Sequence, residues 1–433
     1  MDSINAADTA WLMVCSALVL LMTPGLAMLY GGMVRAKSAL NMILMSFSAL
    51  AVVTLTWIML GYSLAFGAST WGIVGDLRQI GLVDMLDQTY GAEGHKVPMV
   101  VFVMFQLTFA VLTTSLLSGA IADRAKFGAW IVFTIVWSLI VYAPIAHWAW
   151  GFQDGQGGWI GDRLGALDFA GGTVVEINSG ASALALALVL GRRIGFRRDP
   201  MRPHSLPLVL LGAGLLWFGW LGFNAGSALA ADGTAALALI NTQVAGAGAV
   251  LAWLVFERIR DGKATTFGAA TGAIAGLVAI TPACGFVTPL GALAIGVLAG
   301  VVCAWAVGLK YRMGFDDSLD VVGVHGFGGV VGMLGIGLFA ATVANAAGAD
   351  GLLFGGGFEL LGKQVIAILG TAAFAFAMTW VIATIIDRTM GFRVSADDEV
   401  AGVDTTQHAE SAYDLAGVSG GSVLGAHPVT GQR

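Results

Sequence analysis

Long apolar runs recur along this chain, and short polar segments separate them. Each run holds about 20 residues, the length that an α-helix needs to cross the hydrocarbon core of a bilayer. We expect eleven spans, at residues 9–34, 40–67, 97–122, 126–148, 171–191, 205–224, 234–259, 265–281, 287–308, 321–343 and 359–387. The pattern therefore predicts an all-α integral membrane protein with eleven transmembrane helices.

The composition agrees with a place in the lipid bilayer. Of the 433 residues, 57% are hydrophobic and 11% are charged, whereas a soluble domain has about 25% charged residues. The 62 glycines suit a bundle in which small residues let helix backbones approach closely. The chain start lacks the basic region of a secretory signal, so we expect the first span to be retained.

The placement of lysine and arginine predicts the orientation. Sixteen of these residues fall in one set of loops and four in the other. The positive-inside rule places the richer set in the cytoplasm. We therefore expect a multi-pass protein of the cell (inner) membrane with its N-terminus outside. A transmembrane domain over residues 1–390 would precede a cytoplasmic regulatory tail over residues 391–433.

Few residues point to chemistry of other kinds. The three cysteines, Cys15, Cys284 and Cys303, have no paired or Cys-X-X-Cys spacing, so they predict neither a disulfide framework nor a metal site. The net charge of −6, with the basic loops facing the cytoplasm, gives no sign of nucleic-acid binding. We expect a protein that is not an enzyme and has no cofactor.

Two ionisable residues interrupt apolar segments at corresponding places. Asp168 precedes Glu176 by eight positions, and Asp317 precedes His325 by eight positions. Ionisable residues are costly in lipid and usually mark a pathway or site inside the bundle. Five spans fall in each half, about residues 1–200 and 201–345, so the second half enters from the opposite side. We expect a five-plus-five inverted repeat with a midplane site, followed by an extra long C-terminal helix. The alternative is coincidence in a glycine-rich sequence.

Several longer motifs follow one another along the chain. They are Pro24-Gly-Leu-Ala-Met-Leu-Tyr-Gly-Gly32, Asp168-Phe-Ala-Gly-Gly-Thr-Val-Val175, Gly219-Trp-Leu-Gly-Phe-Asn-Ala-Gly-Ser227, Val324-His-Gly326 and a tail motif from Gly402 to Tyr413. Their residues and their order resemble those of the ammonium transporter, methylammonium permease and Rhesus protein family. The resemblance covers nearly the whole chain. It implies a homotrimer with one narrow hydrophobic pore through each subunit.

The resemblance also implies an outer vestibule that recruits ammonium or methylammonium. The matching positions are Phe109, Trp150, Phe223 and Ser227. Aromatic rings attract a small cation within about 6 Å of a ring face, and a hydroxyl adds an acceptor. In the family the two phenylalanines also form a stacked gate at the pore entrance. Taken singly, each phenylalanine would fit core packing, and Trp150 would fit an interfacial anchor.

Glu176 and His325 are the expected pore residues. Most members of the family carry two adjacent histidines here, whereas this chain has a glutamate at the first position. A branch of the fungal transporters also has an acidic residue there. A carboxyl group and an imidazole can each donate or accept a proton, which suits a proton relay. The structural alternative is a buried hydrogen bond that joins two helices, and we expect both roles.

Three further residues are expected to support the site. Asp168 resembles a buried aspartate of the family near the vestibule, and its place before Gly-Gly-Thr predicts a helix cap rather than direct coordination of ammonium. Thr271 and Thr281 match family positions near the pore and would offer hydroxyls. Alternatively, each hydroxyl bonds the preceding helical turn. We expect His147, near the outer end of its span, to be structural.

The cytoplasmic side carries two further signals. The arginine-rich run from Arg192 to Arg198 is foremost a topology determinant. The resemblance implies that this loop also meets a PII-type signal protein. The tail motif around Asp404, His408 and Tyr413 resembles a segment that couples neighbouring subunits. Ala409 stands where a glycine is usual.

Together these features favour an ammonium transporter. Ammonium would bind at the vestibule and lose a proton, and neutral ammonia would cross the apolar pore, because removing the hydration of an ion costs far more. The proton would follow by way of Glu176 and His325. Two other functions fit the motifs: an ammonium sensor that signals through its tail, and a Rhesus-like channel for neutral gas. The matches at Trp150 and Ser227 argue against the gas channel.

Overall fold

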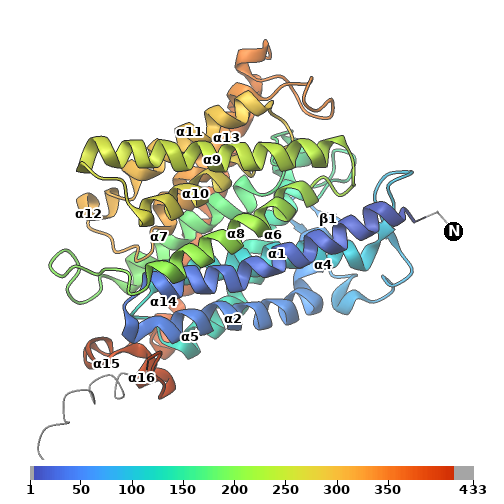
Figure 1. The fold of residues 1–433 in the computed structure, drawn as a ribbon. Coiled ribbons are helices and arrows are strands. Elements are labelled where there is room, and N and C mark those ends of the chain that lie inside the picture. The colour runs from blue at the N-terminus through green and yellow to red at the C-terminus, as the bar shows by residue number, and fades with distance from the viewer. Residues whose placement is uncertain (1–3, 414–433) are drawn as a thin grey trace, which may run out of the picture.

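Helices make up most of residues 4–413, the part of the chain that the computed structural model describes. The long helices run side by side between two ends of one bundle (Figure 1). The start of α1 lies at one end, and α15 and α16 lie at the other. Residues 414–433, the last part of the predicted tail, lie outside the described residues.

The described residues form sixteen α-helices. The first seven are α1 (Ala6–Met33), α2 (Ala39–Thr56), α3 (Tyr62–Phe66), α4 (Met99–Leu116), α5 (Phe127–Trp137), α6 (Ala143–Trp150) and α7 (Asn178–Leu190). The others are α8 (Leu206–Gly226), α9 (Gly233–Asp261), α10 (Thr266–Ile280), α11 (Pro289–Ala306), α12 (Leu309–Met313), α13 (Phe327–Phe339), α14 (Glu359–Met390), α15 (Ala396–Ala401) and α16 (Val403–His408).

Shorter elements extend or connect these helices. The π-helical segments are η2 (Trp57–Gly61), η5 (Ser138–Tyr142), η6 (Trp159–Arg163), η7 (Gly172–Ile177) and η8 (Val322–Gly326). The 3-10 segments are η1 (Ala36–Ser38), η3 (Ile80–Leu82), η4 (Leu117–Ile121) and η9 (Leu352–Phe354). Two small antiparallel hairpins pair β1 (Ser69–Thr70) with β2 (Val74–Gly75) and β3 (Thr89–Tyr90) with β4 (Val97–Pro98).

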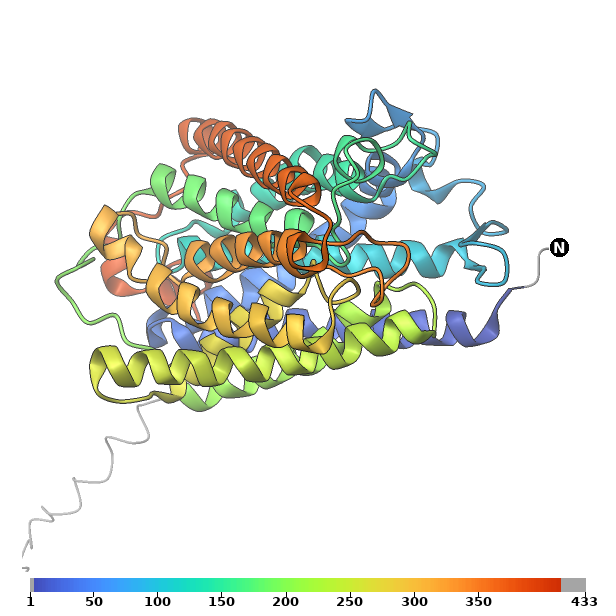
Figure 2. The same ribbon diagram turned by 90° about the horizontal axis from the view of Figure 1, so that it is seen from above.

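The predicted multi-pass helical architecture is confirmed. Ten helical segments in the described chain are long and apolar enough to cross a membrane, and their starts agree with the predicted ones within four residues. The one remaining predicted span, residues 265–281, corresponds to α10. Its 15 residues reach about 22 Å at a rise of 1.5 Å per residue. It packs against α8, α9, α11 and α13 inside the bundle. The long helix α14 runs along one side of the bundle (Figure 2).

The segments that carry the two ionisable pore candidates begin with π-helical turns. Sequence analysis predicts ordinary α-helix here, but Glu176 lies in η7 and His325 lies in η8. Single π-turns inside helices are frequent at functional sites. The two segments approach closely, because a Cβ at Gly180 would lie 2.2 Å from the Cα of Gly326. The glycines at this crossing therefore bring the two pore candidates together.

Glycine also permits the contact between α1 and α8, which lie side by side in Figure 1. A Cβ at Gly212 of α8 would lie 2.3 Å from the backbone N of Leu29, and a Cβ at Gly25 of α1 would lie 3.0 Å from the Cβ of Leu215. Neither position has room for a larger side chain. The high glycine content of the sequence is thus used in helix packing within the bundle.

Candidate functional site

A cavity of about 180 Å³ lies among α4, α6 and the end of α8. Three of the four predicted vestibule residues line it, namely Phe109, Trp150 and Ser227. The fourth, Phe223, packs on Phe109 but is not part of the cavity wall. Asp168 also lines the cavity. The structure therefore brings together residues from four separate segments of the sequence.

Aromatic rings close one side of this cavity. The rings of Phe109 and Phe223 are 4.2 Å apart between centroids with an interplanar angle of 34°. The ring of Trp150 meets Phe109 edge-on, at 5.8 Å and 88°. Both phenylalanines are fully buried. They form an apolar barrier without space for a hydrated ion in this conformation.

Two polar side chains at the cavity wall are held in place by hydrogen bonds to the backbone. The Ser227 hydroxyl donates to the carbonyl oxygen of Phe223 at 2.8 Å, so its own oxygen can still accept a hydrogen bond. The indole N–H of Trp150 donates to the carbonyl oxygen of Asp168 at 3.1 Å. This bond holds the indole ring at the cavity wall.

Sequence analysis missed Gln106, which also lines the cavity. Its Oε1 atom is buried and has no hydrogen-bond partner within residues 4–413. A lone amide in the apolar helix α4, one turn before Phe109, was the available signal in the sequence. A buried acceptor without a partner is costly, so this atom is suited to receive a hydrogen bond from a ligand.

Asp168 caps the segment that carries Glu176, as the sequence predicts. Its carboxylate accepts hydrogen bonds from the backbone N–H groups of Gly171 (2.8 Å), Gly172 (2.6 Å) and Thr173 (2.7 Å). It also accepts one from the Thr173 hydroxyl. These four bonds use the carboxylate as a cap, and its position at the cavity wall adds negative charge there.

Glu176 and His325 form a buried hydrogen-bonded pair. Oε2 of Glu176 lies 2.7 Å from Nδ1 of His325. Glu176 is completely buried and His325 is 5% exposed. The other carboxylate oxygen, Oε1, has no partner within the described residues. The pair can therefore pass a proton between its two members and still has one oxygen available for a third group.

The two threonines form hydrogen bonds to the preceding turn, which was the alternative expectation. The Thr271 hydroxyl donates to the carbonyl oxygen of Phe267 at 3.0 Å, and that of Thr281 donates to the carbonyl oxygen of Leu277 at 2.8 Å. Thr281 has a second bond, because it accepts the indole N–H of Trp220 at 2.8 Å. Trp220 lies beside Phe223, with ring centroids 5.6 Å apart. Thr281 thus supports the aromatic barrier from behind.

His147 is structural, as expected. It is fully buried, Nδ1 lies 2.9 Å from the carbonyl oxygen of Ala65, and Nε2 lies 2.8 Å from the Ser69 hydroxyl. Both ring nitrogens are therefore used within the protein. The side chain connects α6 to the end of α3 and to β1.

Comparison with known proteins identifies the family. The family model described as Ammonium Transporter Family matches residues 10–413. The chain belongs to the ammonium transporter family. A relative from Mycobacterium bovis described as an ammonium transporter is 53% identical, over 97% of this chain and 92% of the relative. The crystal structure of Saccharomyces cerevisiae Mep2 matches with a TM-score of 0.81 and 36% identity, over 91% of this chain and 88% of Mep2. A structure described as a sensor Amt protein matches with a TM-score of 0.84 and 29% identity, over 93% and 98% of the two chains.

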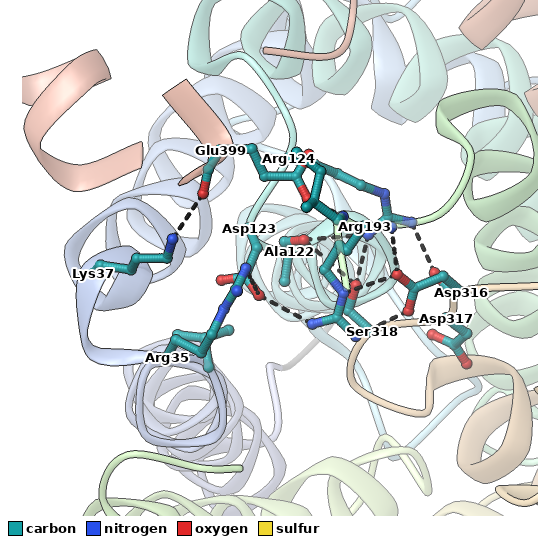
Figure 3. A network of polar contacts seen from close by, with 12 residues as sticks. Arg35, Lys37, Ala122, Asp123, Arg124, Arg193, Asp316, Asp317, Ser318 and Glu399 are labelled. Carbon is teal, nitrogen blue, oxygen red and sulfur yellow. Dashed lines mark hydrogen bonds and ion pairs between the residues drawn. The ribbon is translucent and has the colours of Figure 1, made fainter. Parts of the chain in front are cut away.

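In this member of the ammonium transporter family, a buried ion network joins the loops next to both pore segments (Figure 3). Arg193, just after α7, pairs with Asp123 at 3.0 Å and with Asp316 at 2.9 Å. Arg35 pairs with the same Asp123 at 3.2 Å. Arg124, fully buried, donates to the Ser318 hydroxyl at 2.6 Å. From the sequence, Arg193 is foremost a topology determinant in a loop expected to meet a PII-type signal protein, whereas the structure also uses it as a bridge.

The pKa values of this network follow from burial and charge. Burial alone would raise the pKa of Asp123, but Arg193 and Arg35 outweigh it, and the net pKa is lowered. The pKa of Asp316 is lowered in the same way, with Arg193 as the main opposing group. For Asp317, the charge of Lys310 is too weak to cancel the effect of burial, and burial raises its pKa to about 6. The first two carboxylates are therefore charged at neutral pH.

The described part of the tail docks on the start of α2. The carboxylate of Asp404 accepts hydrogen bonds from the backbone N–H groups of Leu40 (3.0 Å) and Asn41 (2.8 Å). Nε2 of His408 lies 2.9 Å from the side-chain oxygen of Asn41. Ala409 adopts a left-handed conformation with φ of 56°. The turn therefore forms with alanine in a conformation that favours glycine.

Proposed function

We propose that this protein carries ammonium nitrogen across the membrane through the path between the outer cavity and the Glu176–His325 pair. Ammonium binds in the cavity and loses a proton, ammonia crosses the apolar segment, and the pair takes up the proton and passes it on. The observation that carries this proposal is the buried 2.7 Å contact between the Glu176 carboxylate and the His325 imidazole.

The capping contact supports a connection between the cavity and the pair. Asp168 lines the cavity and caps η7, the segment that carries Glu176. Glu176 is four residues beyond the first residue of η7, which is about 6 Å along a helix axis. A proton released at the cavity would therefore have to travel only a short distance to the pair.

The aromatic barrier favours movement of neutral ammonia. Phe109 and Phe223 are buried and tightly packed, so a cation that passed them would lose its water without gaining equivalent contacts. In the cavity, by contrast, the ring faces of Phe109 and Trp150 offer cation–π attraction. Ser227 and Gln106 offer acceptor oxygens there. The cavity thus binds the cation, and the neighbouring Phe109–Phe223 barrier excludes it.

We further propose that Glu176 replaces the first pore histidine that is usual in the family. A carboxylate beside an imidazole can share one proton across the 2.7 Å contact, as two imidazoles can. The carboxylate brings a negative charge that a histidine pair lacks. This difference is expected to shift the pH dependence of transport rather than to abolish it.

The remaining features are proposed from the resemblance and from the charge pattern. The loops rich in lysine and arginine face the cytoplasm, and the N-terminus lies outside. The protein is a homotrimer with one pore in each subunit, built on an inverted repeat. Its tail from residue 391 is regulatory, and a PII-type signal protein binds at the cytoplasmic face.

A sensor function is the second candidate. The match to the structure described as a sensor Amt protein supports it, and so does the docking of the tail on α2 through Asp404. In that case the bound cation would change the position of the tail. The two functions differ in one measurable quantity, which is the net flux of ammonium nitrogen.

Transport can be tested with purified protein in proteoliposomes. A rapid ammonium pulse, with no gradient of another cation, is expected to evoke a current that saturates with ammonium concentration. Uptake of labelled methylammonium, measured in parallel, would also detect flux that carries no net charge and therefore gives no current. If neither a current nor an uptake above that of protein-free liposomes is observed, transport is contradicted and the sensor function remains.

A further inference from the structure

The loop between α7 and α8 holds four exposed arginines, of which Arg192 and Arg197 lie close together. This loop, residues 191–205, contains five arginines. Arg193 is taken up by the ion network described above. Within residues 4–413, no carboxylate forms an ion pair with Arg192 or with Arg197. Both side chains are exposed, and the loop itself lies at the end of the bundle that holds α15 and α16 (Figure 1).

The two guanidinium groups converge on one place, the backbone of Gly314. Nε of Arg192 donates to the carbonyl oxygen of Gly314 at 2.6 Å. A Cβ placed on Gly314 would lie 2.5 Å from Nη2 of Arg192 and 3.7 Å from Nη1 of Arg197. Gly314 ends α12 in a left-handed conformation with φ of 79°. Two like charges therefore border the same small volume, an arrangement that an anion bound between them would stabilise.

The surrounding loop is held in the conformation that produces this convergence. Arg197 has φ of 66°, a left-handed conformation that is unfavourable for a residue other than glycine. The neighbouring ring of Phe196 stacks on Tyr311 of α12, with centroids 5.7 Å apart and an interplanar angle of 11°. Strained backbone that the structure maintains often marks a functional site. In this conformation the Arg197 guanidinium group lies near that of Arg192.

An adjoining cleft provides the space for a ligand. It has a volume of about 520 Å³, and its lining includes Arg197, Arg198, Asp199 and Tyr311. The Asp199 side chain is folded back over Gly195, where a Cβ would lie 2.0 Å from its Oδ2. The single carboxylate of the cleft is thus outnumbered by arginines. The lining therefore favours a negatively charged ligand, and the volume admits a ligand larger than a single ion.

We propose that Arg192 and Arg197 form a binding site for a phosphate group. Planar guanidinium groups bind phosphate oxygens through paired N–H donors, which gives both affinity and orientation. The phosphate group belongs either to the headgroup of an anionic phospholipid or to free inorganic phosphate. Both sources share the chemistry that the two arginines recognise.

The position of this site connects it to the pore. Arg192 follows directly after α7, the continuation of the segment with Glu176, and Gly314 precedes the segment with His325. A bound phosphate would therefore clamp the loops adjoining both members of the pair. Binding itself does not depend on the proposed function, because it can be measured without transport.

The test uses the full-length protein in nanodiscs and follows thermal unfolding by tryptophan fluorescence. In phosphatidylcholine nanodiscs the protein is titrated with inorganic phosphate, with chloride at matched ionic strength as the control. In a second arm, phosphatidylglycerol replaces part of the phosphatidylcholine. A saturable rise in Tm with phosphate but not chloride supports the free-phosphate form of the proposal. A rise only with phosphatidylglycerol supports the headgroup form.

The variant Arg192→Gln/Arg197→Gln is expected to raise the apparent dissociation constant at least about ten-fold, whereas Arg202→Gln, an exposed arginine of the same loop, is expected to leave it unchanged. If the double glutamine variant does not fold, Arg192→Lys/Arg197→Lys keeps the charge and loses the paired donors, and it should weaken binding as well. No rise in Tm in either arm, or an equal rise in the folded double variant, overturns the proposal.

Discussion

Asp168 and Asp317 cap the two pore segments in the same manner. Each lies eight residues before a buried ionisable residue. Asp168 accepts the backbone N–H of Gly172, the first residue of η7, at 2.6 Å. Asp317 accepts the backbone N–H of Val322, the first residue of η8, at 2.7 Å. Equivalent caps on equivalent π-helical starts support our proposal of two related halves.

Removal of the first cap should destabilise the protein. Asp168→Ala would leave the N–H groups of Gly171, Gly172 and Thr173 without their acceptor, and a lost helix cap costs about 1–2 kcal/mol. We expect a lower Tm in detergent for Asp168→Ala and a smaller decrease for Asp168→Asn. The matched control is Asp350→Ala, because the half-buried Asp350 also accepts a backbone N–H, from Thr342. Equal Tm values for the two alanine variants would contradict the capping role.

The two threonines of the α10 region should differ in their effect on stability. Thr281→Val leaves the buried indole N–H of Trp220 without an acceptor, which costs about 1–3 kcal/mol. Thr271→Val removes only a bond to its own helix, so its effect should be below about 0.5 kcal/mol. Thermal unfolding of both variants in the same detergent measures the difference. A larger loss for Thr271→Val would contradict the assignment.

Asp317 should make stability decrease as the pH rises through weakly acidic values. Burial raises its pKa from the ordinary 3.8 to about 6, although Lys310 opposes the shift. Between these values the folded state keeps a proton that the unfolded state has released, so folding is favoured at the acidic end of the window. The difference corresponds to about 3 kcal/mol. We expect the Tm of the wild type to fall between about pH 4 and pH 6 for this reason.

Asp317→Asn keeps the capping oxygen and should show a weaker decrease in Tm over the same window. Asp123 and Asp316 do not interfere, because their lowered pKa values confine their effect to lower pH. Their contribution is complete above the ordinary carboxyl pKa and is lost only as the pH falls below it. An unchanged slope in Asp317→Asn would show that this carboxyl group is not responsible.

The vestibule can be tested at Ser227. Ser227→Leu removes an acceptor and fills part of the 180 Å³ cavity, and a hydrogen bond to a charged ligand contributes about 1.5–3 kcal/mol. We expect the half-saturation concentration for methylammonium uptake to rise about ten-fold or more. Ser227→Thr keeps the hydroxyl and should stay near the wild type. An unchanged value in Ser227→Leu would remove this residue from the recruitment site.

Much of the architecture could be predicted because the bilayer imposes strong constraints on the sequence. Apolar length determines the spans, and their predicted starts agree with the structure within four residues. The contact between Glu176 and His325 could also be predicted, since ionisable residues in lipid need a partner. The cap at Asp168 followed from a short acidic residue before a glycine-rich helix start.

Other features depend on contacts between distant segments. Arg193 and Asp316 are 123 positions apart, and nothing local in the sequence indicates that their loops meet. The π-helical turns at Glu176 and His325 are not indicated by local residue preference either. Gln106 is a single amide in an apolar helix, and only the cavity around it indicates a contact with a ligand. Ala409 shows that tertiary contacts can maintain a left-handed turn without glycine.

The most direct measurement of the central claim is the ammonium-evoked current of Glu176→Gln in proteoliposomes. Glutamine keeps the size and the hydrogen bond to His325 but cannot exchange a proton, and a positioned proton-transfer group typically contributes 100-fold or more. We therefore expect the current to fall at least about ten-fold, with the protein still folded and assembled as in the wild type. Glu176→His, which would create the histidine pair that we propose Glu176 replaces, should retain a current with a shifted pH profile. A Glu176→Gln current equal to that of the wild type would contradict the proton relay.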